Sequence, residues 1–426
     1  MRRRRTTTLL AAGPLLLGTV LLGPAGPAGA APEPRAGVAA GVASSGIDPA
    51  GAARLDAAVR DAMRAAEIPG VIAGLWIDGG PGWTRAFGTA DTSDRAPMRT
   101  DLHTRIGSVT KTFTVTALLR LVDAGRVGLD DPVSRYVDGV PGGERITLRE
   151  LAEMRSGLYD YAQDPGWLKA LRADPDSPWT PRRLLDVAFA HPPNFAPDAK
   201  WEYSNTNIVL LGLVVERVTG RGLSEELRAE VLGPAGLRNT ALPTDAAIPA
   251  PYAHGYTTFS PDGKVVDSAH WNPSWAWAAG AMTSTLADLR SWVGTLVGGV
   301  LPNGDRLLSP GTQAERLRVR PVGVPGVAYG LGIASVNGWL GHNGELPGYE
   351  TVAARLPERN ATLVVIVNSD TDKGGSLSTR IAAAITRIAT PDHLWALPSA
   401  ARPQGPSASG EPSTPSASGP AASRGR

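Results

Sequence analysis

The sequence predicts an α/β fold of the α+β type, in which both ends of the chain build one antiparallel sheet flanked by helices. Strand-like runs lie near both ends, between residues 71 and 87 and between 350 and 368. Helical patterns separated by Pro- and Gly-marked loops fill the middle, which predicts an inserted all-α region over about 125–285. The 426 residues are 42% hydrophobic and 19% charged, which suffices for a large packed core and excludes wholesale disorder.

An amphipathic helix and a hairpin are predicted at the start of the folded part. Asp48 and Pro49 supply a side-chain N-cap and a proline in the first helical turn. Apolar residues then recur every four positions on one helical face: Leu55, Val59 and Met63. We predict antiparallel strands at Val71–Ile77 and Trp83–Phe87, because a glycine-rich turn separates them.

A helix starting at Ser108 is the most deeply buried element that the sequence predicts. The segment from Ser108 to about Ala124 is apolar around most of its circumference, which is typical of a helix enclosed by protein, and Gly125 ends it. The remaining predicted elements are a helix at 285–296, strands at 350–355 and 362–368, and a helix marked by Ile381, Ile385 and Ile388.

The two ends of the chain differ in composition from the rest. Residues 1–30 have the form of a secretory signal: four arginines, an apolar segment and the small residues Ala28-Gly29-Ala30. The apolar segment is shorter than the ~20 residues of a membrane span, so we expect export without a membrane anchor. We expect a flexible lead-in at 31–46, one folded domain at 47–392, and a disordered tail rich in Pro, Ser, Gly and Ala at 393–426.

The charge balance and the lack of cysteine exclude several classes of function. Without the four leader arginines the 42 basic residues become 38 against 40 acidic ones, and no basic stripe is present, so we expect no nucleic-acid partner. Zero cysteines exclude a disulfide scaffold, a zinc finger and a cysteine nucleophile. The six histidines are scattered and form no zinc motif, and there is no phosphate-binding loop. We therefore expect no metal and no cofactor.

The sharpest chemical feature is Ser108 followed three residues later by Lys111. This spacing places both side chains on one face of the predicted buried helix, about one turn apart. A buried lysine is poorly solvated, so its pKa falls and it becomes a base. A serine hydroxyl needs such a neighbour to act as a nucleophile. The pair is common by chance, and an N-cap serine with a surface lysine is the alternative.

Two other segments add groups suited to the same chemistry. Tyr203 and Asn205 lie in a polar loop before an apolar helix, and His342 and Gly344 precede a predicted strand. A tyrosine hydroxyl next to a lysine can move a proton to a leaving amine, and an asparagine can hold the lysine. A glycine on a strand lets the backbone approach a ligand closely.

With these three motifs in this order, the chain resembles the serine penicillin-recognising hydrolases, whose Ser-x-x-Lys signature is well defined. The Tyr-x-Asn and His-x-Gly motifs place the likeness with class C β-lactamases and secreted D-alanyl-D-alanine carboxypeptidases. The most similar segments are RIGSVTKTFT (105–114), RSGLYDY (155–161), EYSNTNI (202–208), 267–284 and 329–349. The resemblance implies a β-lactamase/transpeptidase-like fold and a serine hydrolase catalytic domain over 47–392.

The resemblance also implies a role for each motif residue. Ser108 would attack the substrate carbonyl, Lys111 would take its proton, and Tyr203 would pass that proton to the leaving amine. Asn205 would orient Lys111 and the substrate amide. His342 would lie behind Tyr203 and tune its charge.

Substrate-binding roles follow from the same resemblance. The backbone N–H groups of Ser108 and Glu345, next to Gly344, would form the oxyanion hole. Trp275 would form a wall of the donor pocket, although core packing explains this tryptophan equally well.

Two features depart from the carboxypeptidase pattern: the residues that replace two threonines, and a segment that lacks an arginine. Threonines that read the substrate's terminal carboxylate are replaced by Asn343 and Glu345, and the segment 333–339 lacks the arginine expected there. A Glu side chain repels a carboxylate unless it is protonated or turned away. We therefore expect a weaker preference for free C-terminal carboxylates.

The sequence supports three readings of function. The first is a secreted D-alanyl-D-alanine carboxypeptidase acting on peptidoglycan stem peptides and reacting with β-lactams. The second is a β-lactamase, esterase or D-aminopeptidase with the same machinery. The third is a penicillin-binding protein that deacylates slowly. In each case we expect a monomer whose partner is a small peptide or β-lactam substrate.

Overall fold

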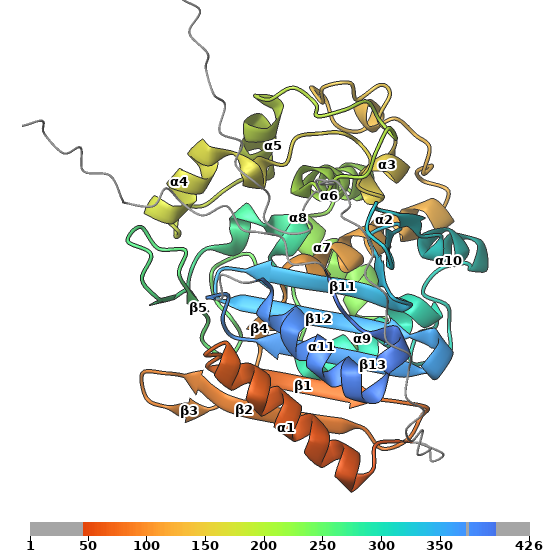
Figure 1. Cartoon of the computed structure of the whole chain (residues 1–426). Coiled ribbons are helices and arrows are strands. Elements are labelled where there is room, and N and C mark those ends of the chain that lie inside the picture. The colour runs from red at the N-terminus through yellow and green to blue at the C-terminus, as the bar shows by residue number, and fades with distance from the viewer. Residues whose placement is uncertain (1–45, 372–374, 398–426) are drawn as a thin grey trace, which may run out of the picture.

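The computed structural model describes residues 46–371 and 375–397 (Figure 1). The predicted signal at 1–30, nearly all of the lead-in, and the tail from 398 onward lie outside the described residues. Within this part of the chain, no helix is long and apolar enough to cross a membrane.

An antiparallel sheet of nine strands forms the centre of the described structure. Its order is β3-β2-β1-β13-β12-β11-β10-β9-β8. The strands are β1 (Gly70–Trp76), β2 (Trp83–Asp91), β3 (Ala96–Pro97), β8 (Arg320–Pro321), β9 (Val327–Tyr329), β10 (Ala334–Val336), β11 (Trp339–Leu346), β12 (Tyr349–Leu356) and β13 (Ala361–Val367). Because β1 pairs with β13 in the register Val71↔Val367, both ends of the domain meet in the middle of the sheet, as predicted.

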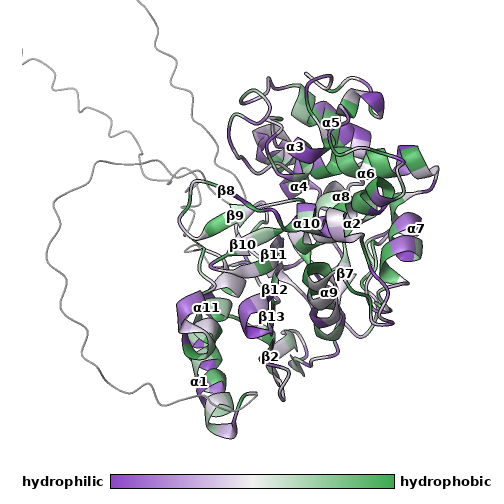
Figure 2. Ribbon diagram, turned by 90° about the vertical axis from the view of Figure 1, so that its right-hand side faces the viewer, coloured by the Kyte–Doolittle hydropathy of each residue, from purple (hydrophilic) through white to green (hydrophobic). Residues whose placement is uncertain are grey.

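Helices cover both faces of the sheet (Figures 1 and 2). One face carries α1 (Pro49–Ala65) and α11 (Leu377–Ala389), which pack on each other. The other face carries α9 (Leu286–Gly298), with α2 (Thr110–Asp123) beyond it. Strand β13 shows the alternation that this layering needs: Leu363 and Val365 face the α1–α11 cluster, whereas Val364 and Ile366 face the other cluster.

The predicted helix signals correspond to real helix ends. Asp48 caps α1 by accepting a hydrogen bond from the Gly51 backbone N–H, and Pro49 occupies the first turn. Helix α2 is buried on nearly all sides, which confirms the reading of 108–124 as an enclosed helix, although Ser108 itself lies in a preceding 3-10 turn, η1 (Gly107–Val109).

The middle of the chain is mainly helical, but the prediction of a purely helical insertion was wrong. Its helices are α3 (Leu148–Ala152), α4 (Pro165–Ala173), α5 (Pro181–Phe189), α6 (Asn205–Thr219), α7 (Leu223–Leu227) and α8 (Trp277–Gly280), and α10 (Pro310–Leu317) follows α9. Two small strand pairs interrupt them: β4 (Thr104–Arg105) with β7 (Thr283–Ser284), and β5 (Tyr256–Thr257) with β6 (Val266–Asp267). Strands of two residues are too short to show a period of two in the sequence.

The His342–Gly344 motif precedes β12, which corresponds to the strand predicted at 350–355, but it also lies within β11. Strand β11 was not predicted, because its glycines and polar residues masked the strand pattern. One predicted boundary needs correction. The domain continues past residue 392: Trp395 is fully buried, and the Trp339 indole N–H donates to the His393 carbonyl. Burial of Trp395 holds the first residues of the predicted tail against the folded domain.

The packing of α11 gives a stability prediction. Ile381 is fully buried between α11 and the sheet, so Ile381→Ala leaves a cavity and should lower the free energy of unfolding by about 2–5 kcal/mol. Chemical denaturation measures this change. The matched control is Arg387→Ala on the exposed side of the same helix, which should change stability by less than about 0.5 kcal/mol. Equal effects of the two substitutions would contradict the assigned packing of α11.

Candidate active site

The 3-10 turn that carries Ser108 lies directly against strand β11. Gly107 has a positive φ of 51°, and a Cβ atom there would lie 2.4 Å from the Glu345 backbone nitrogen. A Cβ atom on Gly344 would lie 2.0 Å from the Ile106 carbonyl oxygen and 2.9 Å from the Ser108 nitrogen. Only glycine permits this approach, which brings the two predicted oxyanion-hole amides next to each other.

Lys111 is fully buried and holds three oxygen atoms around its ammonium group. Its Nζ atom lies 2.8 Å from Ser108 Oγ, 2.8 Å from Asn205 Oδ1 and 2.7 Å from the Ala279 carbonyl oxygen. Burial lowers the pKa of Lys111 to about 7, against an opposing effect of Asp160. Lys111 therefore changes charge near neutral pH, and its neutral form has a lone pair that can accept the Ser108 hydroxyl proton.

Tyr203 contacts the same serine. Its hydroxyl donates to Ser108 Oγ over 2.7 Å, and Lys111 Nζ lies 4.8 Å from the centre of its ring. Burial raises the pKa of Tyr203 well above its usual value, so the resting phenol is neutral and acts as a donor. Ser108 Oγ thus contacts one proton acceptor and one proton donor, as acyl transfer requires.

Asn205 begins helix α6 and reaches Lys111 through its side-chain oxygen. The other end of the same amide is held by Asp160, a buried carboxylate that the sequence did not suggest as a site residue. Asp160 lies in the RSGLYDY segment, and the likeness of that segment to the family was the available signal.

His342 lies close to Tyr203 but bonds to a different tyrosine. The His342 Nδ1–H donates to the Asn343 carbonyl, and the Tyr329 hydroxyl donates to His342 Nε2 over 2.9 Å. Burial lowers the pKa of His342 to about 3, with a further contribution from Lys111. The imidazole is therefore neutral, and both of its nitrogens make hydrogen bonds to other groups. The centres of the His342 and Tyr203 rings lie 6.4 Å apart. This geometry gives the imidazole no direct hydrogen bond with which to tune Tyr203.

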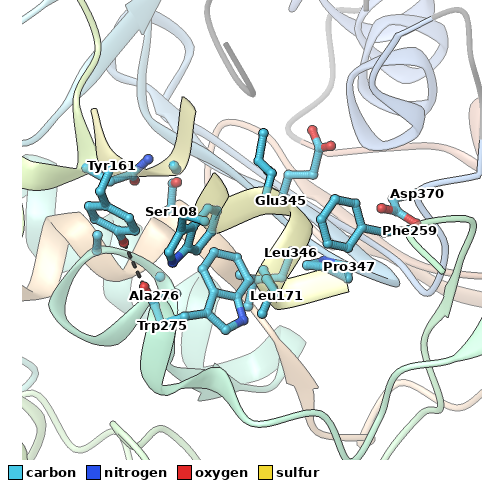
Figure 3. A pocket seen from close by; sticks show the side chains of 16 residues that line it. Ser108, Tyr161, Leu171, Phe259, Trp275, Ala276, Glu345, Leu346, Pro347 and Asp370 are labelled. Carbon is cyan, nitrogen blue, oxygen red and sulfur yellow. Dashed lines mark hydrogen bonds between the residues drawn. The ribbon is translucent and has the colours of Figure 1, made fainter. Parts of the chain in front are cut away.

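A pocket beside Ser108 opens between the sheet and the helical region (Figure 3). Trp275 lines it, as the sequence suggested, and the Tyr161 hydroxyl donates to the Trp275 carbonyl over 2.8 Å. The large apolar side chains of its lining are Tyr161, Trp167, Leu168, Leu171, Phe259, Trp275 and Leu346. The sequence reasoning missed Trp167 and Phe259, because they come from separate loops and helices.

The substrate-binding residues predicted on β11 divide into two groups. Glu345 lines the pocket, and Gly344 lies against the Ser108 turn. The Glu345 carboxylate is directed away from Ser108 in Figure 3. Burial raises the pKa of Glu350, and the charge of Glu345 adds to this rise. Asn343 is nearly buried in the middle of the strand and is not part of the pocket lining.

One edge of β11 is open along the pocket. Strand β10 pairs only with Trp339–Gly341, although β11 continues to Leu346. Within the described residues, the remainder of β11 is therefore paired with a strand on the β12 side alone. An extended acyl group can align along such an edge through main-chain hydrogen bonds.

No group of three or more His, Cys, Asp or Glu side chains suited to a metal ion occurs in residues 46–371 and 375–397. We assign none of the described residues to a metal or cofactor.

The β-lactamase family model matches residues 55–386, which is most of the folded domain. This chain belongs to the β-lactamase family of serine hydrolases. The central antiparallel sheet with its flanking helices is accordingly the β-lactamase/transpeptidase-like fold, as the resemblance implied.

Relatives of this β-lactamase-family domain include hydrolases that act on D-amino acid derivatives. A D-aminopeptidase of Cereibacter sphaeroides is 29% identical over 354 residues, which covers 79% of this chain and 62% of the relative. The chain therefore spans less than two thirds of that relative's length. A D-stereospecific amidohydrolase structure from Streptomyces sp. has a TM-score of 0.69 and 34% identity, covering 79% of this chain and 98% of its own. A D-amino acid amidase from Ochrobactrum anthropi in complex with D-phenylalanine has a TM-score of 0.66 and 29% identity, covering 79% and 97%.

The buried amine of this β-lactamase-family site predicts a pH profile. Below a pH of about 7 Lys111 is protonated and blocked as a base, so acylation of Ser108 should increase as the pH rises through that value. Lys111→Ala should lower the acylation rate by about 10²–10⁴-fold and remove this dependence. Intact mass spectrometry after rapid quenching, with p-nitrophenyl acetate as acyl donor, measures both. The exposed Lys169→Ala is the control; a wild-type profile in the Lys111 variant would refute the base assignment.

The contact between β11 and the Ser108 turn gives a second test. Gly344→Ala should push the two oxyanion-hole amides apart and reduce acylation by about 10²–10³-fold, the usual effect of losing one such donor. Gly294→Ala is the control, because its added Cβ atom meets no atom within 4 Å. Stopped-flow acylation rates on the folded variants measure the effect. Normal acylation by Gly344→Ala would show that these amides do not stabilise the oxyanion.

Proposed function

We propose that this serine hydrolase cleaves amide bonds next to D-configured amino acid residues with large apolar side chains, through an acyl-enzyme on Ser108. The observation that carries the proposal is the pocket beside Ser108, whose lining is mainly aromatic and aliphatic. The D-aminopeptidase, D-stereospecific amidohydrolase and D-amino acid amidase relatives support the assignment of stereochemistry.

The geometry supports the following sequence of steps. Neutral Lys111 takes the Ser108 hydroxyl proton while Ser108 Oγ bonds to the substrate carbonyl carbon. The resulting oxyanion lies near the backbone amides of Ser108 and Glu345. The carbon–nitrogen bond then breaks, and the leaving amine receives the proton through Tyr203. Water, deprotonated by the same groups, releases the acyl product and restores Ser108.

D-alanyl-D-alanine carboxypeptidase activity is a second candidate, favoured by the likeness of the RSGLYDY and EYSNTNI segments. The pocket is less suited to this substrate. Among its described lining residues none is Arg or Lys, so the lining offers no cation for a terminal carboxylate. A penultimate D-alanine would also place only a methyl group against several aromatic rings.

Secretion and a monomeric state belong to the same proposal. The export signal predicted at 1–30 would deliver the domain outside the cell, where stem peptides and D-amino acid derivatives are available. Mass spectrometry of the mature chain and size-exclusion chromatography test these two points.

A substrate panel separates the candidate functions. We expect D-phenylalanine p-nitroanilide to be hydrolysed at least about tenfold faster than its L isomer, which corresponds to about 1.4 kcal/mol of discrimination. Acetyl-D-Ala-D-Ala should react no faster than its C-terminal amide. Hydrolysis rates of all four compounds, with Ser108→Ala as control, measure this.

Other outcomes would replace the proposal. A strong preference for the free acid would favour the carboxypeptidase. Rapid release of penicilloate from benzylpenicillin would favour a β-lactamase, and a long-lived penicilloyl adduct on Ser108 would favour a penicillin-binding protein.

A further inference from the structure

A buried carboxylate, Asp160, is hydrogen-bonded to Asn205, which in turn contacts Lys111 beside Ser108. Asp160 is 1% exposed and caps the 3-10 turn Tyr161–Gln163. Its Oδ1 accepts hydrogen bonds from the backbone N–H groups of Ala162 (3.2 Å) and Asn205 (3.1 Å). The Asn205 side-chain Nδ2 donates to Asp160 Oδ2 over 3.1 Å and lies 3.3 Å from Oδ1.

The neighbours of Asn205 leave only one orientation for its amide. A carboxylate only accepts hydrogen bonds and an ammonium only donates them, so the amide nitrogen must face Asp160 and the amide oxygen must face Lys111. The short 2.8 Å contact between Lys111 Nζ and Asn205 Oδ1 depends on this orientation. We infer that Asp160 is a positioning residue, which locks the Asn205 amide and thereby holds the Lys111 amine against Ser108.

Asp160 also acts on Lys111 through its charge. Burial raises the pKa of Asp160 to about 6, and Lys111 opposes that rise. In return, Asp160 favours the charged form of Lys111. The other titratable groups that face this pair are Tyr159, Tyr161 and Tyr203, whose pKa values are raised, and His342, whose pKa is lowered; all four are neutral in the working range.

A purely structural role for Asp160 predicts something different. Its contacts with the Ala162 and Asn205 backbone N–H groups stabilise a turn and the start of α6, and their loss would lower stability alone. Positioning of Lys111 through Asn205 predicts in addition a slower acylation step and a shifted pH profile.

The decisive substitution is Asp160→Asn, which changes one oxygen into a donor at almost constant volume. If the new amide oxygen keeps the backbone bonds, its nitrogen faces the Asn205 nitrogen, and Asn205 must turn and present its own nitrogen to Lys111. We expect acylation by p-nitrophenyl acetate to slow at least about tenfold at the alkaline plateau. The acid limb of the pH profile, where acylation rises as Lys111 loses its proton, should move to lower pH. The reason is that the Asp160 charge, which favours protonated Lys111, is gone.

A double variant that exchanges the residues at positions 160 and 205 restores the hydrogen bond between them and moves the negative charge to position 205. In Asp160→Asn combined with Asn205→Asp, the amide at position 160 donates to a carboxylate at position 205, which contacts Lys111 directly. We expect the plateau rate to recover relative to the single variant, and the acid limb to move above that of the wild type. The control is Asp288→Asn, a buried acid that bonds Thr240 and the Asn239 backbone, which should lower stability and leave the pH profile unchanged.

The outcomes separate this inference from the function on which it rests. A wild-type protein that forms no acyl adduct on Ser108 would refute the proposed function. A folded Asp160→Asn with wild-type rate and profile would overturn the inference alone, and so would a folded double variant whose acid limb stays in place. If neither variant folds, the role of Asp160 is structural and the inference is rejected.

Discussion

The burial of the Lys111 amine is the constraint on which the rest of the site depends. A lysine with its usual pKa would stay charged at neutral pH and could not accept a proton from Ser108. Protein on all sides lowers the pKa of Lys111 to about 7, and oxygen atoms from the η1 turn, α6 and α8 accept hydrogen bonds from its amine. The helical region therefore has to close tightly over α2, which explains why this helix is apolar around its circumference.

The second requirement is contact between the helical region and the sheet. Gly107 and Gly344 have no Cβ atom, and a Cβ atom at either position would keep the Ser108 turn away from β11. The Lys111 amine and the Tyr203 hydroxyl then contact Ser108 from the helical side, whereas the Glu345 amide comes from the sheet. The aromatic pocket lies between the two parts, so its shape depends on both.

Much of this arrangement could be predicted from local sequence patterns. Ser108 and Lys111 lie one helical turn apart on the same segment, and capping and periodicity located α1, α2 and α11. Asp160 and Phe259 could not be predicted, because their roles arise only when distant loops converge. The bond between His342 and Tyr329 joins β11 to β9 past the intervening β10, and neither segment has a sequence signature for it. Trp395 lies in a low-complexity context that hides its burial.

The pairing of β1 with β13 has a consequence for the order of events during synthesis. The ribosome adds Ser108, Lys111 and Tyr203 to the chain long before it reaches β11. Strand β1 cannot pair with β13 until β13 has been synthesised. A nascent or truncated chain thus carries Ser108 without the strand against which its turn packs. The close contact between Ser108 and the Gly344–Glu345 backbone can form only after β11 has been synthesised.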